Sequence, residues 1–529
     1  MTSAGGSRRR GIALAALVAA ALLAFQAWRA RDPRVYTRFE LPAFDAYAYV
    51  AMAEEPRVFT IAPWGYRVLA PGLTHLVAGG EPTRVLRAFR AVNLGALLAA
   101  ALLLWLFQRR LGLAPWAALV GTAAFTLSPP VAALLRNPYL TDAVVVALEA
   151  AFLLAVEAGA GVPVLVFLAA SGALAKESFL LLVPAVYFAR RRRDGDARAL
   201  ASTAAALLAA AAVTVLLRWW WTPHLHTDVP AARWDTLLAA AANVRAFAGR
   251  QPWAGWLLLA AVAATLLAAR RAEGRSLLAR FGYVALAALA APFFNPVVFS
   301  AGDVSRLLVH ALPVLVPVLV SALPGAWAAP ARAAPSRGRI GRPAAIVAAA
   351  AALAAPFVLD RYRRADLRGP RDGPLVLAFC RDTLRTARRL QRGEAVTFDP
   401  ATRQFEWGVS DPGRLHRMRW FLREGWGERA HYGTGAVAMS APRADLAIPS
   451  LDGRDLNLTL HLRAADDAAG TVLVNGHAVG QWRAGLAAQT FFLPAGALFR
   501  GDNVATVEVA AGDPRQVRLE RFTVAPAGR

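Results

Sequence analysis

The first residues that could do chemistry lie in two short stretches near the N-terminus. Asp45 lies in FDAYAYV, and the later PWGYR contains Tyr66 and Arg67. A carboxylate can take a proton from a hydroxyl group or hold a metal ion, and the arginine fork binds phosphate through two hydrogen bonds. The combination suits a polyhydroxylated, phosphorylated ligand. The alternative is that Asp45 caps a helix and Arg67 anchors a membrane interface.

Two further groups of ionisable residues lie at the ends of apolar stretches. Asp142 opens NPYLTDAVVVALEA, where an acidic residue could also simply cap the helix and meet its dipole. The segment GDVSRLLVHALP contains Asp303, Arg306 and His310. Arg306 and His310 are four positions apart, so they share one helical face, which we expect to point into a helix bundle. The alternative is an Asp303–Arg306 ion pair that closes the helix end.

Lys176 is the only lysine among 59 lysines and arginines, and it lies beside Glu177 inside an apolar block, residues 161–189. A charge in such a block is costly, so intramembrane ionisable residues usually mark a function. The ammonium could neutralise a phosphate, and Glu177 could orient the lysine or bind a metal. The alternative is a Lys176–Glu177 pair that satisfies itself at the tip of a re-entrant hairpin.

The elements that must position these residues are membrane helices. Mean hydropathy is +0.40, and 57% of the residues are hydrophobic. Most apolar blocks have the length of a bilayer-spanning helix; they are 11–28, 91–107, 115–135, 139–158, 161–189, 199–217, 253–269, 281–299, 307–325 and 343–359. The net charge of +24 comes from arginines clustered between these blocks, as the positive-inside rule predicts, and not from a nucleic-acid-binding surface. The single cysteine, Cys380, excludes an intrachain disulfide.

The arginine clusters predict the path of the chain through the membrane. We expect about eleven helices, with a retained N-terminal anchor, the N-terminus inside and the C-terminus outside. The block 161–189 ends in four arginines, residues 190–193, which return to the inner side only if it forms two short helices that turn near Lys176. Each arm of about 14 residues is about 21 Å long, so the turn should lie within protein or a wet cavity. This topology places all the candidate residues on the outer side.

The sequence after residue 359 predicts a different fold class. We expect a transmembrane domain over residues 1–359, a mixed connector over 360–443 and a β-sandwich over 444–529, because short alternating segments separated by turn residues begin near 444. Asn475-Gly476 between apolar runs predicts a β-hairpin. The order VNG, VGQW, FFLP and GDN resembles galactose-binding-like jelly rolls, which occur as carbohydrate-binding modules. Trp407, Trp426 and Trp482 could stack on sugars, although core packing is the simpler interpretation.

The membrane part, roughly residues 11–359, resembles the GT-C superfamily of membrane glycosyltransferases. The shared features are an aspartate in the first outer loop, a downstream YR-x-L-x-P, a KE pair in a hydrophobic hairpin and many helices. The resemblance implies a polyprenyl-phosphate-linked sugar as donor and a protein, lipid or glycan acceptor on the outer face of a bacterial cytoplasmic membrane. It implies inverting transfer with Asp45 as the catalytic base and Asp142 as the second acid of the site.

The same resemblance implies that Lys176, Arg67 and Arg306 contact the donor phosphate, with Tyr66, Glu177, Asp303 and His310 in supporting positions. No adjacent acidic pair occurs at Asp45, since Glu54-Glu55 comes later, so the requirement for a divalent cation stays open. His224 and His226, in a tryptophan-rich outer loop, are only a weak metal signal.

Two other functions fit the same sequence. The first is a transporter or flippase for a lipid-linked glycan, but transporters bind near the membrane midplane between internal repeats. Here no repeat is evident and the candidate residues lie toward one side. The second is a non-catalytic envelope protein whose sandwich binds glycan, in which the membrane acids would be dispensable.

Overall fold

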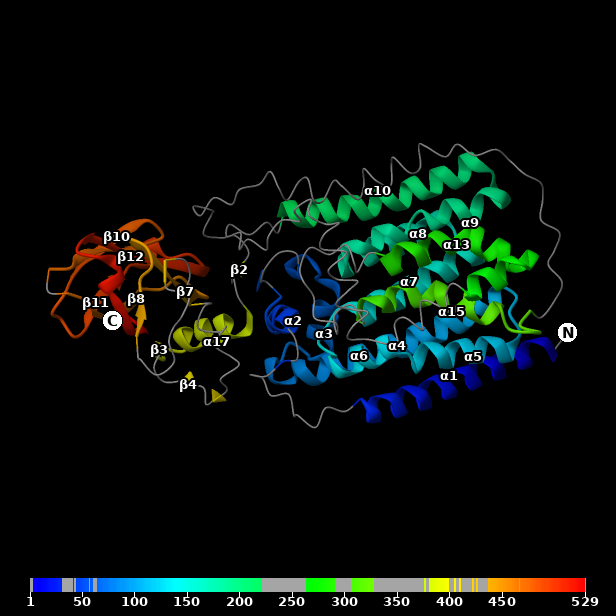
Figure 1. The fold of residues 1–529 in the computed structure, drawn as a ribbon, viewed down its shortest axis with the longest axis horizontal. Helices are drawn as coiled ribbons and strands as arrows, with labels where there is room; N and C mark the ends of the chain where they lie inside the picture. Colours follow the sequence, from blue (N-terminus) through cyan, green and yellow to red (C-terminus); the bar gives the residue numbers. More distant parts are fainter. Residues whose placement is uncertain are drawn as a thin grey trace. The chain divides into compact units, whose positions relative to one another are not determined.

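The computed structural model describes two compact units of the chain (Figure 1). The first unit comprises Met1–Tyr49, Tyr66–Trp220 and Asp228–Arg363, and the second comprises Val50–Gly65, Trp221–Thr227 and Arg364–Arg529. The described residues are 3–30, 41, 44–56, 58–59, 64–220, 263–290, 306–327, 375–376, 380–398, 404–405, 409–410, 421–422, 425–426, 436–465 and 467–528.

The regular elements of the first unit are helices wherever the chain is described. Its early elements are α1 (Ser3–Arg29), α2 (Phe44–Glu54), η1 (Trp64–Tyr66), α3 (Leu69–Val77), η2 (Pro82–Arg84), α4 (Val85–Arg110), α5 (Pro115–Thr126) and α6 (Pro129–Arg136). The later elements are α7 (Asp142–Ala158), α8 (Val162–Ala175), η3 (Glu177–Leu182), α9 (Ala185–Asp194), α10 (Asp196–Trp220), α13 (Ala272–Ala290), η5 (Leu308–Ala311) and α15 (Leu312–Ser321).

Three of the described helices are long and apolar enough to cross a membrane: Gly11–Arg29, Pro82–Arg110 and Asp196–Arg218. A fourth span is possible if α5 and α6, which meet at a bend of 46°, are counted as one. The prediction of apolar helices of membrane-spanning length is confirmed. The number of eleven helices stays a prediction, since the blocks at 253–269, 281–299 and 343–359 lie partly or wholly outside the described residues.

The apolar block 161–189 is a hairpin with its tip at Lys176. Helix α8 ends at Ala175, and Lys176 is extended, with φ −167° and ψ 133°, before η3 begins. The chain then returns along α8, because the Arg190 guanidinium at the end of α9 donates to the Ala160 carbonyl at the start of α8. Phe179 packs against Gly172, which has no side chain to hold it away. The predicted turn near Lys176 is confirmed.

Arginine-rich connections gather at the end of the first unit opposite to this tip. Gly11 at the start of the apolar part of α1 lies against Trp105 near the end of α4. Arg271, before α13, donates to the carbonyls of Ser321 and Leu323 at the end of α15. Within the described residues, the start of α1 therefore lies beside the end of α4, and the segment before α13 lies beside the end of α15.

The second unit contains two β-sheets that share one hydrophobic core. The first consists of β1 (Val58–Phe59), β2 (Leu375–Val376), β7 (Arg443–Ser450), β9 (Ala469–Val474), β10 (His477–Arg483) and β12 (Gly501–Ala511). The second consists of β3 (Val396–Phe398), β6 (Val437–Ala438), β8 (Leu456–Arg463), β11 (Gln489–Leu493) and β13 (Arg518–Pro526). Helix α17 (Cys380–Gln391) and the pair β4 (Gln404–Phe405) and β5 (Val409–Ser410) complete its described elements.

Alternation places every second side chain of the strands in this core. In β8 the leucines at 456, 458, 460 and 462 are buried and the residues between them are half-buried, as expected of a strand with one covered face. The turn between β9 and β10 has positive φ at Asn475 (48°) and Gly476 (84°), which confirms the predicted hairpin. The prediction of an all-β tail is thus confirmed at the level of sheets.

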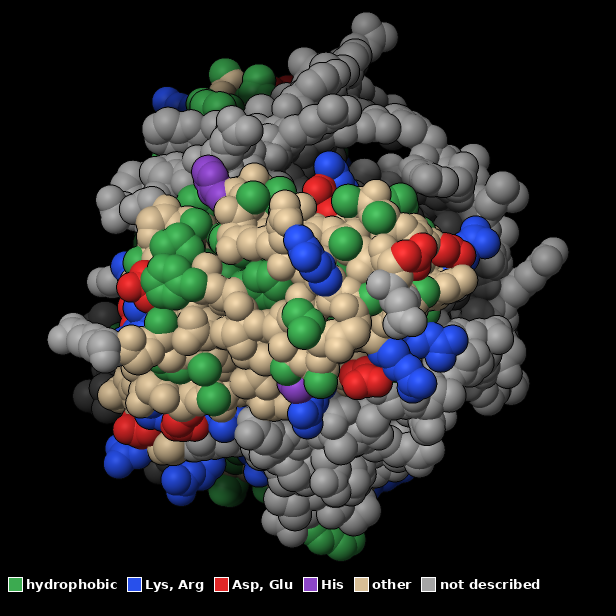
Figure 2. Space-filling view, turned by 90° about the vertical axis from the view of Figure 1, so that its left-hand side faces the viewer, with side chains coloured by type: hydrophobic (Ala, Val, Ile, Leu, Met, Phe, Trp, Pro, Cys, Tyr) green, Lys and Arg blue, Asp and Glu red, His purple; other side chains and the backbone are tan. Residues whose placement is uncertain are grey.

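Trp482 and Trp426 are core residues of the second unit. Trp482 is fully buried and its indole N–H donates to the Glu508 carbonyl at 2.8 Å. Trp426 is also buried and donates to the Asp445 carbonyl at 2.8 Å, while Trp407 lies outside the described residues. The side chains of Trp482 and Trp426 are therefore unavailable for stacking on a sugar. On the face of the unit shown in Figure 2, apolar, acidic and basic side chains are interspersed among the described residues.

Candidate functional site

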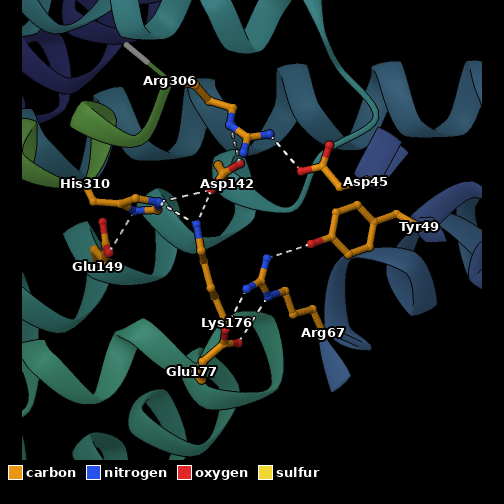
Figure 3. A network of polar contacts seen from close by, with 9 residues as sticks. All are labelled: Asp45, Tyr49, Arg67, Asp142, Glu149, Lys176, Glu177, Arg306 and His310. Carbon is orange, nitrogen blue, oxygen red and sulfur yellow. Dashed lines mark hydrogen bonds and ion pairs between the residues drawn. The ribbon is translucent and has the colours of Figure 1, made fainter. Parts of the chain in front are cut away.

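Nine polar residues of the first unit form one network at the end where the hairpin tip lies (Figure 3). They come from the start of α2, the segment before α3, α7, the tip between α8 and η3, and the turn that leads into α15. The nine are Asp45, Tyr49, Arg67, Asp142, Glu149, Lys176, Glu177, Arg306 and His310. The structure thus brings together segments up to 261 residues apart in sequence.

Asp142 is at the centre of this network. It is only 3% exposed, and its Oδ1 accepts a hydrogen bond from the Lys176 ammonium at 2.6 Å and lies 3.1 Å from Nε2 of His310. Its Oδ2 lies 3.7 Å from Nε of Arg306. Asp142 occupies the first turn of α7, where a carboxylate is also favoured by the helix dipole. Helix capping alone therefore does not account for it.

Arg306 connects two of the three aspartates that the sequence singles out, Asp45 and Asp142. Its Nη1 donates to Oδ2 of Asp45 at 2.9 Å, and its Nε faces Asp142. Asp45 lies in the first turn of α2. The alternative partner Asp303 lies outside the described residues, so its predicted supporting position stays a prediction.

The alternative of a self-satisfied Lys176–Glu177 pair is wrong. Glu177 instead accepts two hydrogen bonds from Arg67, from Nε at 3.1 Å and from Nη2 at 2.6 Å. The third donor of Arg67, Nη1, binds the hydroxyl of the buried Tyr49 at 2.9 Å. Lys176 is extended, so its side chain and that of Glu177 reach different partners. Adjacent residues at the tip thus tie it to α7 and to the segment before α3.

His310 lies between two carboxylates of α7. Its Nδ1 is 3.0 Å from Oε1 of Glu149, while its Nε2 is 3.1 Å from Oδ1 of Asp142 and 3.3 Å from the nitrogen of Lys176. Both ring nitrogens donate only when the imidazole is protonated. The other oxygen of Glu149, Oε2, is buried and has no hydrogen-bond partner among the described residues.

Sequence reasoning did not name Glu149, and it took Tyr49 only as part of the aromatic stretch that follows Asp45. Glu149 is seven residues, or two helical turns, after Asp142, so both lie on the same face of α7. Tyr49 is four residues after Asp45 on α2, with the same consequence. Helical spacing from the chosen aspartates could therefore have found both.

The remaining predicted residues lie outside the network or outside the described residues. Tyr66 is buried with the Arg218 guanidinium above its ring, 4.6 Å from the centroid. His224 and His226 are not described. Among the residues that the structure describes, no three or more His, Cys, Asp or Glu side chains are grouped so as to hold a metal ion.

The charges of the network are close to balance. It contains four carboxylates (Asp45, Asp142, Glu149 and Glu177) and three permanent cations (Arg67, Lys176 and Arg306). With a neutral His310 the sum is about −1, and with a protonated His310 it is about zero. Buried charges are tolerated when they are paired, which explains why so many ionisable residues are stable together inside an apolar bundle.

Comparisons of the chain with protein-family models, with curated proteins and with solved structures found no match.

Proposed function

We propose that this chain is an integral membrane glycosyltransferase of the GT-C type. It moves a sugar from a polyprenyl-phosphate donor to an acceptor on the outer face of a bacterial cytoplasmic membrane. The observation that carries the proposal is the convergence of Asp45, Arg306, Asp142 and Lys176 in one contact chain. Catalytic acids beside phosphate-binding cations are what such a transfer requires.

In the proposed reaction, Asp45 takes the proton from the acceptor hydroxyl. The acceptor oxygen forms a bond to the anomeric carbon while the bond from that carbon to the phosphate oxygen breaks. The electron pair of the broken bond leaves with the polyprenyl phosphate, so the configuration at the sugar inverts. Asp142 holds Lys176 and His310 in place through contacts of 2.6 and 3.1 Å.

The leaving phosphate gains negative charge as the bond breaks, and the cations of the network stabilise it. Lys176 carries three N–H donors, and among the described residues its nitrogen has two polar partners, Asp142 at 2.6 Å and His310 at 3.3 Å. Arg67 has five donors, of which three are used on Glu177 and Tyr49. Both cations therefore keep hydrogen-bonding capacity for phosphate oxygens without giving up their carboxylates.

The sidedness of the first unit supports the proposed orientation. Arginine-rich connections gather at one end and the network lies at the other. By the positive-inside rule we infer that the arginine end faces the cytoplasm, with the N-terminus inside and the network outside. The β-sheets of the second unit are then an outer domain, for which we propose a jelly-roll topology and a role in holding a glycan.

The proposal is tested by Asp45→Asn in the full-length protein, with Asp467→Asn in an exposed turn as the matched control. Transfer is measured with a panel of polyprenyl-phosphate sugars, and folding is checked by thermal unfolding. Loss of a general base should lower transfer by at least about 100-fold, while Asp467→Asn should keep the rate of the unmodified protein. Unchanged transfer by a folded Asp45→Asn protein would refute the proposal.

A lipid-linked glycan transporter is the second candidate. The buried contact chain from Glu149 through His310 to Asp142 favours it, because such chains carry protons in pumps and transporters. A transporter would move labelled lipid-linked glycan between the leaflets of a vesicle without forming a new glycosidic bond. The same Asp45→Asn protein separates the two functions, since only the enzyme needs Asp45 as a base.

A further inference from the structure

His310 is the residue of the network whose charge can change near neutral pH while its ring keeps the same contacts. Its ring contacts Glu149 through Nδ1, and Asp142 and Lys176 through Nε2. A neutral ring donates through Nδ1 to Glu149 and accepts from Lys176, whereas a protonated ring donates to both carboxylates. The same geometry therefore accommodates both charge states, and an ordinary histidine pKa lies near 6.5.

Other charged or titratable side chains near η5 are engaged elsewhere. Helices α6 and α13 also pack against η5. Arg136 of α6 donates to the Ala132 carbonyl. On α13, Arg275 donates to the Ala269 carbonyl, and Arg280 pairs with Glu157. Tyr283 donates to the Leu182 carbonyl. Glu273 lies in the first turn of α13, at the arginine-rich end. Arg306, on the same turn as His310, lies against Asp45 and Asp142.

An anionic ligand changes the charge that this network must carry. Four carboxylates against three permanent cations leave about −1 when His310 is neutral, and a bound phosphodiester adds another negative charge. Extra negative charge in a buried site is costly unless it is compensated. One proton on His310 compensates it, and Glu149, with its second oxygen buried and unpartnered among the described residues, stabilises the resulting imidazolium.

We propose that His310, held by Glu149, takes up a proton when the phosphate of the donor binds beside Lys176. His310 and Glu149 are then positioning residues that set the charge of the site, while Lys176 contacts the phosphate. The inference rests on the proposed function for the presence of a phosphate at Lys176. Because the bound form holds one more proton, affinity is highest at low pH and falls as pH rises, by at most about tenfold per pH unit.

The test is calorimetric titration of the full-length protein with a short-chain prenyl methyl phosphodiester. This probe has no second titratable oxygen, so any proton taken up belongs to the protein. Titrations at several pH values between about 6 and 8, each in two buffers of different ionisation enthalpy, count the protons. We expect the unmodified protein to take up about one proton per ligand at the upper end of this range.

Two variants and one control locate the proton. His310→Gln should bind without proton uptake and with an affinity that no longer changes with pH. Glu149→Gln should shift the uptake to lower pH, because the imidazolium loses its carboxylate. His477→Gln, the same change on an exposed histidine of β10, should behave as the unmodified protein.

The outcomes separate the inference from the function on which it rests. Binding with no proton uptake and a flat pH dependence overturns the inference and leaves the phosphate site intact. Proton uptake that persists in His310→Gln overturns it as well, since another group then carries the proton. If no protein binds the phosphodiester at any pH, the proposed donor site itself is wrong.

Discussion

Replacing Lys176 with methionine removes the ammonium from the network while keeping a long side chain in the same space. The Lys176 nitrogen lies 2.6 Å from Oδ1 of Asp142, and the two side chains are only 10% and 4% exposed. The variant therefore leaves a buried carboxylate without its shortest ion pair. Breaking a buried pair in this way destabilises a protein by about 3–5 kcal/mol.

The remaining neighbours of Asp142 determine how much of the free energy of unfolding is lost in Lys176→Met. Nε2 of His310 stays 3.1 Å from Oδ1, and Nε of Arg306 stays 3.7 Å from Oδ2. A partly compensated carboxylate costs less than an isolated one. We therefore expect the lower end, about 3 kcal/mol of the free energy of unfolding, which is roughly a 150-fold change in the equilibrium constant.

The assay is reversible unfolding of the full-length protein in mixed micelles of a mild detergent and dodecyl sulfate. The double variant Lys176→Met with Asp142→Asn should recover part of the loss, because the unpaired charge is gone. Arg193→Met is the control: its pair with Asp194 has the arginine 50% exposed, and exposed pairs contribute about 0–1 kcal/mol. The reasoning is refuted if Lys176→Met costs no more than this control, or if the two changes at Lys176 and Asp142 are simply additive.

Two further predictions concern packing. Gly172→Val should destabilise the hairpin by about 1–3 kcal/mol, because a Cβ at this position overlaps the Phe179 ring. The control Gly95→Ala, where a Cβ meets nothing within 4 Å, should be neutral or stabilising by up to about 1 kcal/mol. Equal changes of the free energy of unfolding for both variants, measured in mixed micelles, would contradict this prediction. Trp482→Phe should speed amide hydrogen exchange in β9, β10 and β12 of the full chain, because it removes the hydrogen bond to the Glu508 carbonyl and leaves a cavity. If these strands exchange at the rate of the unmodified protein, Trp482 does not stabilise the sheet.

The hairpin could be predicted from sequence because two constraints act on one short segment. A block of apolar residues has a fixed length as a helix, and the arginines at 190–193 must return to the side that holds the other arginines. Together they leave one place for the turn, at Lys176, where the structure has it. The meeting of Asp142, Lys176 and Arg306 then follows, since all three were expected at the same end.

The pairing within the network could not be predicted in this way. The side of the membrane predicts at which end of the bundle a residue lies, but it does not predict its partner. Glu177 was expected to contact Lys176, whereas it forms an ion pair with Arg67. The contact depends on the extended backbone of Lys176, which turns two neighbouring side chains apart. Glu149 could have been found from the cost of a charge inside an apolar helix and from its spacing of two turns from Asp142, but neither observation predicts its contact with His310.

The same division holds for the β-sheets. Strand β8 alternates between buried and half-buried residues, and a period of two is visible in sequence. Strand β7 begins near 444, where the β-sandwich was expected to start, but it shows no such period, because five consecutive residues, 446–450, are buried. A strand covered on both faces is recognised from its neighbours in space, which sequence periodicity does not contain.

The extended tip of the hairpin gives the chain an unusual chemical property. Because Lys176 is the only lysine in the 529 residues, the sole side-chain amine of the chain lies inside the network. A protease that cuts after lysine therefore has one target peptide bond, and an amine-selective reagent has one side-chain target besides the N-terminal amine. Both targets at Lys176 are shielded while the tip is closed, since the residue is buried. The rate of either reaction measures how often the site opens, without any label being introduced.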